Sequence, residues 1–144
     1  MSLVYVFAAS PMEGKPVEKL SVPPEPGSPG RCGPNEVVLA VTGMGPKNAE
    51  KKAEAVLRWA PGESPAAKPD AVLVVGMCGG LTESIQEGRF VTYSECRSTK
   101  SSDPVLACSP TISTAIFELL EVSDLGCEQV VGIPSSSGNG VGPQ

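Results

Sequence analysis

Short apolar runs, separated by segments rich in glycine and proline, dominate the sequence. Residues 3–9 and 36–42 are apolar and β-prone, and residues 71–75 form an unbroken apolar run rich in valine. Runs this short are typical of strands, and strands covered on both faces belong to parallel sheets. The pattern therefore predicts an α/β fold with a mostly parallel central sheet.

Helical spacing of apolar residues occurs in two places. A helix is expected from Pro46, because proline is tolerated in a first helical turn. A second helix is expected over residues 111–122, with Ser109 or Thr111 as its cap, and further strands over residues 89–93 and 129–133. The apolar face predicted for the first helix consists of Ala49, Ala53, Val56, Leu57 and Ala60.

Two segments are expected to lack regular structure. The chain from Pro11 to Pro34 is rich in proline, so residues 22–34 are expected to form an exposed loop. Residues 134–144 are rich in glycine and serine, which predicts a disordered tail. A chain of 144 residues suits one domain, and we place it at residues 1–133.

Composition excludes several classes of function. A formal net charge of -5 disfavours nucleic acid and anionic membranes as partners. No apolar run reaches the roughly 18 residues of a membrane span, and the start lacks a basic leader, so a cytoplasmic protein is expected. The 5 cysteines show no paired spacing and are expected to be reduced thiols. The absence of histidine removes Ser-His and Cys-His pairs, and no metal or cofactor is expected.

Three strand ends would meet at one edge if the sheet is parallel. They are residues 12–14, 42–45 and 76–80, and each contains glycine. Glycine lets a ligand approach the backbone, and the helix near Pro46 adds a weak positive dipole at the same edge. A tight turn with a helix cap explains Gly43 and Gly45 equally well, and Asn48 excludes a dinucleotide-binding fingerprint.

The same segments resemble the nucleoside phosphorylase and nucleosidase superfamily. VYVFAASPME (4–13) is similar to the family's first strand and its turn with methionine and glutamate, and VTGMG (41–45) to its Ser/Thr-Gly-x-Gly turn. PDAVLVVGMCGGL (69–81) is similar to its central strand and glycine turn, and EGRFV (87–91) to a later strand. The resemblance spans residues 3–96, and the family includes purine and uridine phosphorylases and methylthioadenosine/S-adenosylhomocysteine nucleosidase.

The resemblance implies a three-layer α/β fold that cleaves the N-glycosidic bond of a purine-type nucleoside, with water or phosphate as acceptor. Glu13 matches the carboxylate that activates water, although a solvated turn glutamate is the plain alternative. Cys78 falls on the turn that borders ribose and base in the family, where a packing thiol is the alternative to a nucleophile. The implied substrate-binding residues are Gly43, Met44, Gly45, Met77, Cys78 and Gly79.

Departures from the family pattern restrict these expectations. The phosphorylases hold phosphate with a serine and an arginine where this chain has Met77 and Val74, so hydrolysis is favoured over phosphorolysis. Arg89 replaces an aspartate. The family's Met-Glu segment, which holds the ribose, and its aspartate, which protonates the base, have no match here, so a C-terminally truncated domain is expected.

Three functions therefore stay open from the sequence. The chain is a nucleosidase, a non-catalytic binding module of the same fold, or an unrelated Rossmann-like protein. Antiparallel strands at residues 36–42 and 71–75 would favour the last. An uncovered edge strand near residues 129–133 also predicts pairing with a second copy, and hence a homo-oligomer.

Overall fold

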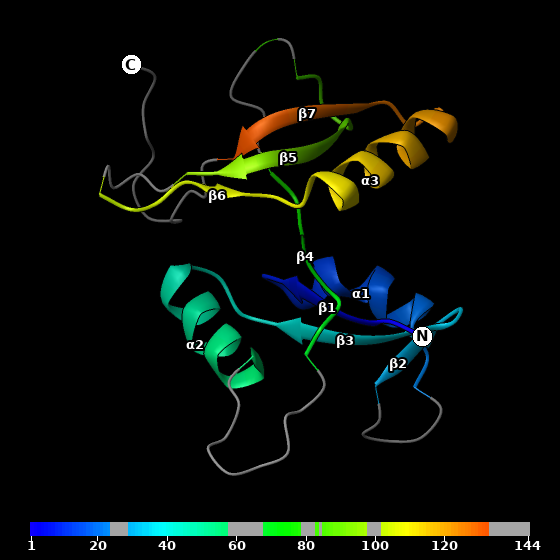
Figure 1. Ribbon diagram of the computed structural model, residues 1–144, viewed down its shortest axis with the longest axis vertical. Coiled ribbons are helices and arrows are strands. Elements are labelled where there is room, and N and C mark those ends of the chain that lie inside the picture. Colours follow the sequence, from blue (N-terminus) through cyan, green and yellow to red (C-terminus); the bar gives the residue numbers. More distant parts are fainter. Residues whose placement is uncertain (24–28, 58–67, 79–82, 84, 98–101, 133–144) are drawn as a thin grey trace. The chain divides into compact units, whose positions relative to one another are not determined.

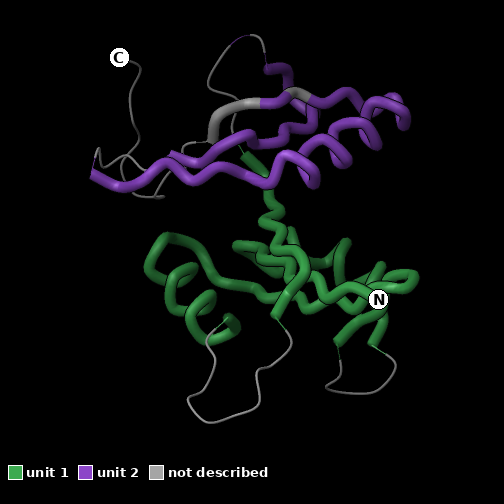
Figure 2. The backbone as a smooth tube through the Cα atoms, viewed as in Figure 1, with its two compact units in different colours: residues 1–78, 137–144 green, residues 79–136 purple. Residues whose placement is uncertain are grey.

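The computed structural model describes residues 1–23, 29–57, 68–78, 83, 85–97 and 102–132. The chain divides into two compact units; of the described residues, those up to 78 belong to unit 1 and those from 83 onward to unit 2 (Figure 2). Each unit combines a sheet with helices. The expected single domain over residues 1–133 stays a prediction, and the expected tail at 134–144 lies outside the described residues.

Unit 1 is built on a four-stranded sheet with the order β2-β3-β1-β4 (Figure 1). Strand β1 (Leu3–Ala8) lies between β3 (Asn35–Val41) and β4 (Ala71–Val75) and pairs in parallel with both. Strand β2 (Gly30–Cys32) is antiparallel to β3. The parallel pairing confirms the predicted fold class and differs from the antiparallel arrangement that would favour an unrelated protein.

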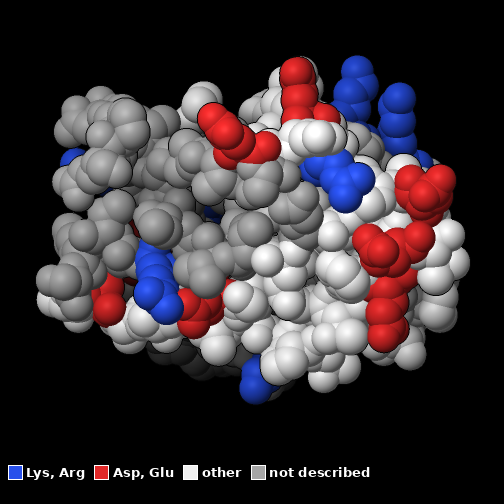
Figure 3. Space-filling model, turned by 90° about the horizontal axis from the view of Figure 1, so that it is seen from above, with Lys and Arg blue, Asp and Glu red and all other residues white. Residues whose placement is uncertain are grey.

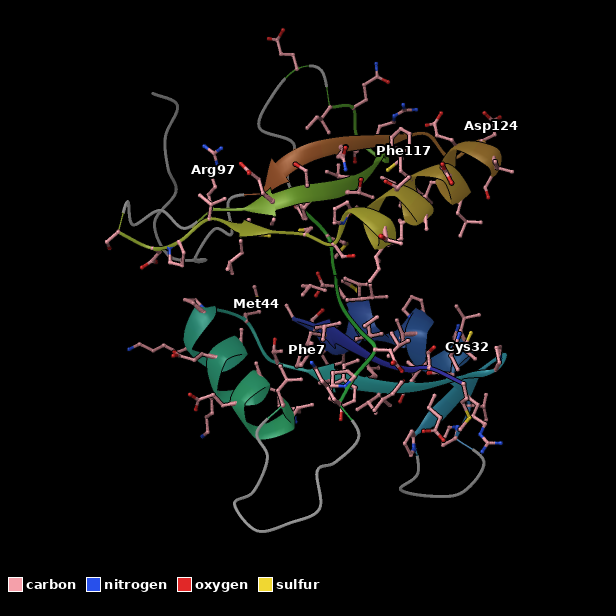
Figure 4. All side chains as sticks on the ribbon, viewed as in Figure 1. Phe7, Cys32, Met44, Arg97, Phe117 and Asp124 are labelled. Carbon is pink, nitrogen blue, oxygen red and sulfur yellow. The ribbon has the colours of Figure 1, made fainter. Side chains whose placement is uncertain are left out.

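Two helices cover opposite faces of this sheet. Side chains alternate between faces along a strand, so Tyr5 and Phe7 share one face and Val6 and Ala8 the other. On the first face, Ala53 and Val56 of α2 (Pro46–Leu57) pack against a cluster of Tyr5, Phe7 and Ala40 (Figure 4 labels Phe7). Helix α1 (Pro11–Leu20) contacts β1 and β3 on the other face. Unit 1 therefore has three layers.

Helix α1 lies in the proline-rich stretch for which the sequence analysis predicted no helix. Its first residue is Pro11, which costs no hydrogen bond because the first amides of a helix have no partner within it. Ser10 and Glu13 form a reciprocal capping box that supplies the missing partners. The buried Gly14 then allows a close approach to β3, since an added Cβ would lie 3.2 Å from Leu39 Cδ2.

The predicted loop over residues 22–34 is also wrong in part, because β2 begins at Gly30. Residues 24–28 lie outside the described residues, but the amide of Arg31 donates to the Val22 carbonyl oxygen at 3.1 Å. A Cβ at Gly30 would collide with the backbone of Ser21, whose amide closes the end of α1. Glycine therefore permits the contact that turns this segment into a strand.

Strand β4 is less covered than the sequence predicted. Val72 and Val74 pair with Tyr5 and Phe7 and share their face, yet they are 46% and 84% exposed. The reason is the position of β4: α2 packs over β1 and β3, whereas β4 is an edge strand of the sheet. The valine-rich run identified a strand correctly but did not distinguish a central strand from an edge strand.

Unit 2 contains a three-stranded sheet with the order β6-β5-β7. Strand β5 (Phe90–Cys96) is antiparallel to β6 (Leu106–Ala107) and parallel to β7 (Cys127–Gly132). Helix α3 (Pro110–Val122) packs on β5 and β7 and is capped by Ser109, as predicted. Strand β6 was not predicted, and β7 begins two residues earlier than expected. Strand β7 is an edge strand, but the expected homo-oligomer stays a prediction.

In unit 2, Arg89 lies against Gly126, the residue before β7. An added Cβ on Gly126, whose φ is +59°, would collide with the Arg89 guanidinium. The amide of Phe90 donates to the Gly126 carbonyl oxygen at 3.4 Å. The arginine that departs from the family pattern thus packs against the backbone of Gly126.

The cysteines of the chain are free thiols. All the cysteines lie in the described residues and none forms a disulfide. Burial, with the nearby Cys108 thiol, raises the pKa of Cys96.

Within the described ranges no helix is long and apolar enough to cross a membrane. On the face that Figure 3 shows, described acidic and basic side chains both occur, without a continuous basic surface.

Candidate functional site

The carboxyl ends of β3, β1 and β4 lie side by side in unit 1. Parallel pairing places Val41 beside Ala8 and Val75 beside Ala8 on its other side. Thr42 fixes this edge, because its amide donates to the Ala8 carbonyl oxygen at 2.9 Å and its Oγ1 to the Gly43 carbonyl oxygen at 2.8 Å. The segments that follow the three strands therefore share one edge, as the sequence predicted, and ligands of α/β sheets bind at such edges.

The turn after β3 depends on two glycines. Gly43 and Gly45 have φ values of +82° and +93°, a left-handed backbone that favours glycine. Asn48, in the first turn of α2, donates from Nδ2 to the Met44 carbonyl oxygen at 2.7 Å. Met44 itself is 68% exposed in this turn (Figure 4). The backbone of the turn is thus fixed while its methionine side chain faces solvent.

The Glu13 carboxylate connects the segment after β1 with the turn after β4. Oε2 accepts hydrogen bonds from the amide and from the Oγ of Ser10, both at 3.0 Å. Oε1 accepts one from the Met77 amide at 2.9 Å, across a sequence separation of 64 residues. Glu13 is half-buried at this junction. The carboxylate thus joins two elements of the sheet edge, and its catalytic role stays a prediction.

These hydrogen bonds lower the pKa of Glu13 below its ordinary value of 4.5. The Met77 amide is the largest cause and the Ser10 hydroxyl the second, since both favour the ionised form. A lowered folded pKa means that the carboxylate stabilises the fold fully above its unfolded pKa. This contribution is lost as the pH falls through the folded value. Glu13 is accordingly an ionised acceptor at neutral pH.

The turn after β4 comes close to this carboxylate. An added Cβ on Gly76 would lie 3.0 Å from Glu13 Oε1, so glycine allows the approach. Met77 is 72% exposed and Cys78 is exposed as well. Of the predicted substrate-binding residues, Gly79 lies outside the described residues. The others, Gly43, Met44, Gly45, Met77 and Cys78, lie in the turns that follow β3 and β4.

One residue of this edge, Ser10, was missed by the sequence analysis. Ser10 holds the carboxylate of Glu13, and the signature of a serine three residues before a glutamate is readable in a sequence. Met12 lies in the first turn of α1 and is 66% exposed. With Met44 and Met77 it is one of three exposed methionines on segments that follow the parallel strands. No group of three or more acidic, cysteine or histidine residues able to hold a metal occurs in the part of the chain that the structure describes.

Comparison with known proteins identifies the family of this chain. The sequence model described as "Phosphorylase superfamily" matches residues 17–122. Curated proteins give no match. Among solved structures, the chain is similar to 5′-methylthioadenosine/S-adenosylhomocysteine nucleosidase from Neisseria meningitidis in complex with methylthio-immucillin-A. The identity is 18%, the TM-score is 0.78, and the match covers 94% of this chain and 65% of that one.

Two further nucleosidases have the same fold. One is the Helicobacter pylori enzyme with butyl-thio-DADMe-immucillin-A, at 13% identity and TM-score 0.75, covering 95% of this chain and 66% of that one. The other is S-adenosylhomocysteine nucleosidase from Streptococcus pyogenes with 5-methylthiotubericidin. It has 15% identity and TM-score 0.72, covering 94% of this chain and 64% of that one. The chain thus spans slightly less than two thirds of the length of the N. meningitidis and S. pyogenes nucleosidases.

Proposed function

The chain belongs to the phosphorylase superfamily, and from this premise we propose that it binds a purine-type nucleoside at the edge formed by Glu13 and the turns after β3 and β4, and hydrolyses its N-glycosidic bond. In this reaction the bond between the ribose C1′ and the base breaks, the water oxygen bonds to C1′, and the base leaves with a proton. The neighbouring nucleosidase structures hold nucleoside analogues, which supports this class of ligand.

One observation supports this proposal more than any other. The Glu13 carboxylate and the Met77 amide, which meet at 2.9 Å, bring the segment after β1 to the glycine turn after β4. The turn of Gly43 and Gly45 follows the third parallel strand of the same edge. A ribose seated there would face the backbone of the two glycine turns and the Glu13 carboxylate.

Glu13 is suited to orient a water molecule. An ionised carboxylate offers about four acceptor positions, and three hydrogen bonds from Ser10 and Met77 fill most of them. The Ala9 backbone contributes a further, weaker interaction, so a water would donate to Oε1, which accepts one hydrogen bond from the Met77 amide. A carboxylate with a lowered pKa is a weak base, but the ribosyl cation that forms during bond cleavage is a strong electrophile. Holding the water in place therefore matters more than deprotonating it in advance.

The exposed methionines favour a planar base as ligand. Met12, Met44 and Met77 are 66%, 68% and 72% exposed. Thioether side chains adapt to the shape of a ligand and make favourable contacts with aromatic rings. A purine ring held between such side chains would cover apolar surface that is otherwise in water.

Water is favoured over phosphate as the acceptor. Phosphate binding needs cationic or hydrogen-bonding donors, and the positions that hold phosphate in the phosphorylases are occupied by Met77 and Val74. Val74 is 84% exposed and apolar. The net charge of -5 also opposes the binding of an anion.

Nucleoside binding without turnover is the second candidate function. It is favoured by the hydrogen bonds from Ser10 and Met77, which already occupy most acceptor positions of the Glu13 carboxylate. Under this alternative, adenosine raises the melting temperature of the protein by mass action but no free base accumulates. The turns and Glu13 then serve binding alone.

A site-resolved titration tests where the ligand binds. We expect adenosine at millimolar concentration to shift the backbone amide resonances of Gly43, Met44, Gly45, Met77 and Cys78 in ¹H–¹⁵N spectra more than those of β2 or α3. Uridine and inorganic phosphate, titrated separately, are expected to give smaller shifts. Shifts centred on β2 or α3, or none at saturation, would mean that this edge is not the nucleoside site.

A further inference from the structure

Ser10 is placed between β1 and α1 with its hydroxyl directed at Glu13. We propose that Ser10 is a positioning residue, whose hydroxyl fixes the rotamer of Glu13 so that Oε1 faces the Met77 amide. The Ser10 Oγ donates to Glu13 Oε2 at 3.0 Å and accepts from the Glu13 amide at 3.3 Å. The proposal rests on the role proposed above for Glu13.

The geometry requires a group that donates and accepts at once. A glutamate side chain has several rotatable bonds, and two hydrogen bonds to the same oxygen, from the Ser10 amide and Oγ, fix its far end. A helix cap alone needs only an acceptor, which aspartate or asparagine also provides. The hydroxyl therefore has a second task beyond starting the helix, namely to hold the carboxylate.

The second capped helix provides a contrast within the same chain. Ser109 caps α3 by accepting from the Ile112 amide at 3.5 Å, and the residue three positions after it is isoleucine. Among the described residues, no carboxylate is bonded to the Ser109 hydroxyl. Ser109 is thus a matched control, because its removal weakens a helix cap in unit 2 without touching Glu13.

The ionisation of Glu13 is governed by hydrogen bonds. Its lowered pKa results from the Met77 and Ser10 groups and, to a smaller extent, the Ala9 backbone, with partial burial acting in the opposite direction. No charged side chain is among these causes. The titratable groups on the elements packed around it are Lys15, Glu18 and Lys19 of α1, Tyr5 of β1, Arg31 and Cys32 of β2 and Glu36 of β3, with Asp70 just before β4 and Cys78 just after it.

The test compares Ser10→Gly, Ser10→Thr and Ser109→Ala with the wild-type protein. Glycine at an N-cap lowers the stability of a helix much less than alanine does. Ser10→Gly is therefore expected to keep the fold while it removes the hydroxyl. The pKa of Glu13 is measured by carboxyl ¹³C NMR, which does not depend on turnover. Where base release is detectable, its pH profile and kcat are measured as well.

We expect Ser10→Gly to raise the pKa of Glu13 and to move the acidic limb of the pH–rate profile to higher pH. The loss of one hydrogen bond is expected to lower kcat about 3- to 10-fold. Ser10→Thr is expected to restore the wild-type pKa, and Ser109→Ala to leave it unchanged. An unchanged pKa in Ser10→Gly would overturn the proposal. A raised pKa in a protein that releases no base would support the positioning role while contradicting the proposed hydrolysis.

Discussion

Replacing Glu13 by glutamine is expected to slow base release by about 100-fold or more while the fold is retained, because a positioned acid–base or orienting group contributes on this scale. Glutamine is accepted at the third position of a capping box, so α1 still begins at Pro11. The amide has only one acceptor oxygen, however. When that oxygen accepts from Ser10, the amide nitrogen faces the Met77 N–H, donor against donor. Initial rates of base release measure the effect.

A second glutamate of α1 provides the control. Glu18→Gln removes the same charge from an exposed position near the C-terminal end of the helix. We expect it to leave the rate unchanged, and the melting temperatures of both variants are compared with that of the wild type. Equal rates in Glu13→Gln and wild-type protein would show that Glu13 neither orients the water nor holds the turn.

Replacing Gly76 by alanine is expected to lower kcat by about 10- to 100-fold, because displacements well below 1 Å are costly when a reacting group must be aligned. The new Cβ would lie 3.0 Å from Glu13 Oε1, so the carboxylate must move away from the Met77 amide. Gly76 does not have a left-handed backbone, and alanine is therefore compatible with its conformation. Its effect comes from the contact with Glu13.

A double-mutant cycle isolates this contact. In a protein that already carries Glu13→Gln, the further change Gly76→Ala is expected to reduce base release much less than it does in the wild type, since neighbouring groups are not additive. The rates of base release by the four proteins give the coupling free energy between Gly76 and Glu13. Independent, additive losses would show that Gly76 affects the reaction by a route that does not involve Glu13.

The periodic parts of the fold could be predicted from the sequence. The apolar run before Gly76 and the helical spacing of Ala53 and Val56 identified β4 and α2, and the glycine turns identified the edge where the strands end. These signals are local. They report which residues avoid water and where the backbone must turn, and a buried cluster around Phe7 confirms them.

Helix α1 was missed because composition outweighed a local motif. The frequent prolines from Pro11 onward indicate a loop, but Pro11 occupies the first turn of a helix, where proline is favoured. The serine and glutamate that flank this turn were the opposing signal. Attention to that capping box would have predicted both the helix and the hydrogen bond between Ser10 and Glu13.

Other features depend on contacts between distant segments and were beyond a local pattern. The hydrogen bond from the Met77 amide to Glu13 requires that β4 pair with β1 in one particular register. The exposure of Val74 depends on which strands α2 covers. Strand β2 requires the close approach of Gly30 to Ser21. None of these follows from the spacing of apolar residues.

Release of free adenine from adenosine or 5′-methylthioadenosine, in buffer without phosphate, tests the central claim most directly. Wild-type protein and Glu13→Gln are compared at equal concentration, after thermal unfolding shows that both are folded. We predict release by the wild-type chain, no acceleration when phosphate is added, and a rate at least about 100-fold lower in the variant. Absence of release from a folded wild-type sample, or release that requires phosphate, would contradict the account.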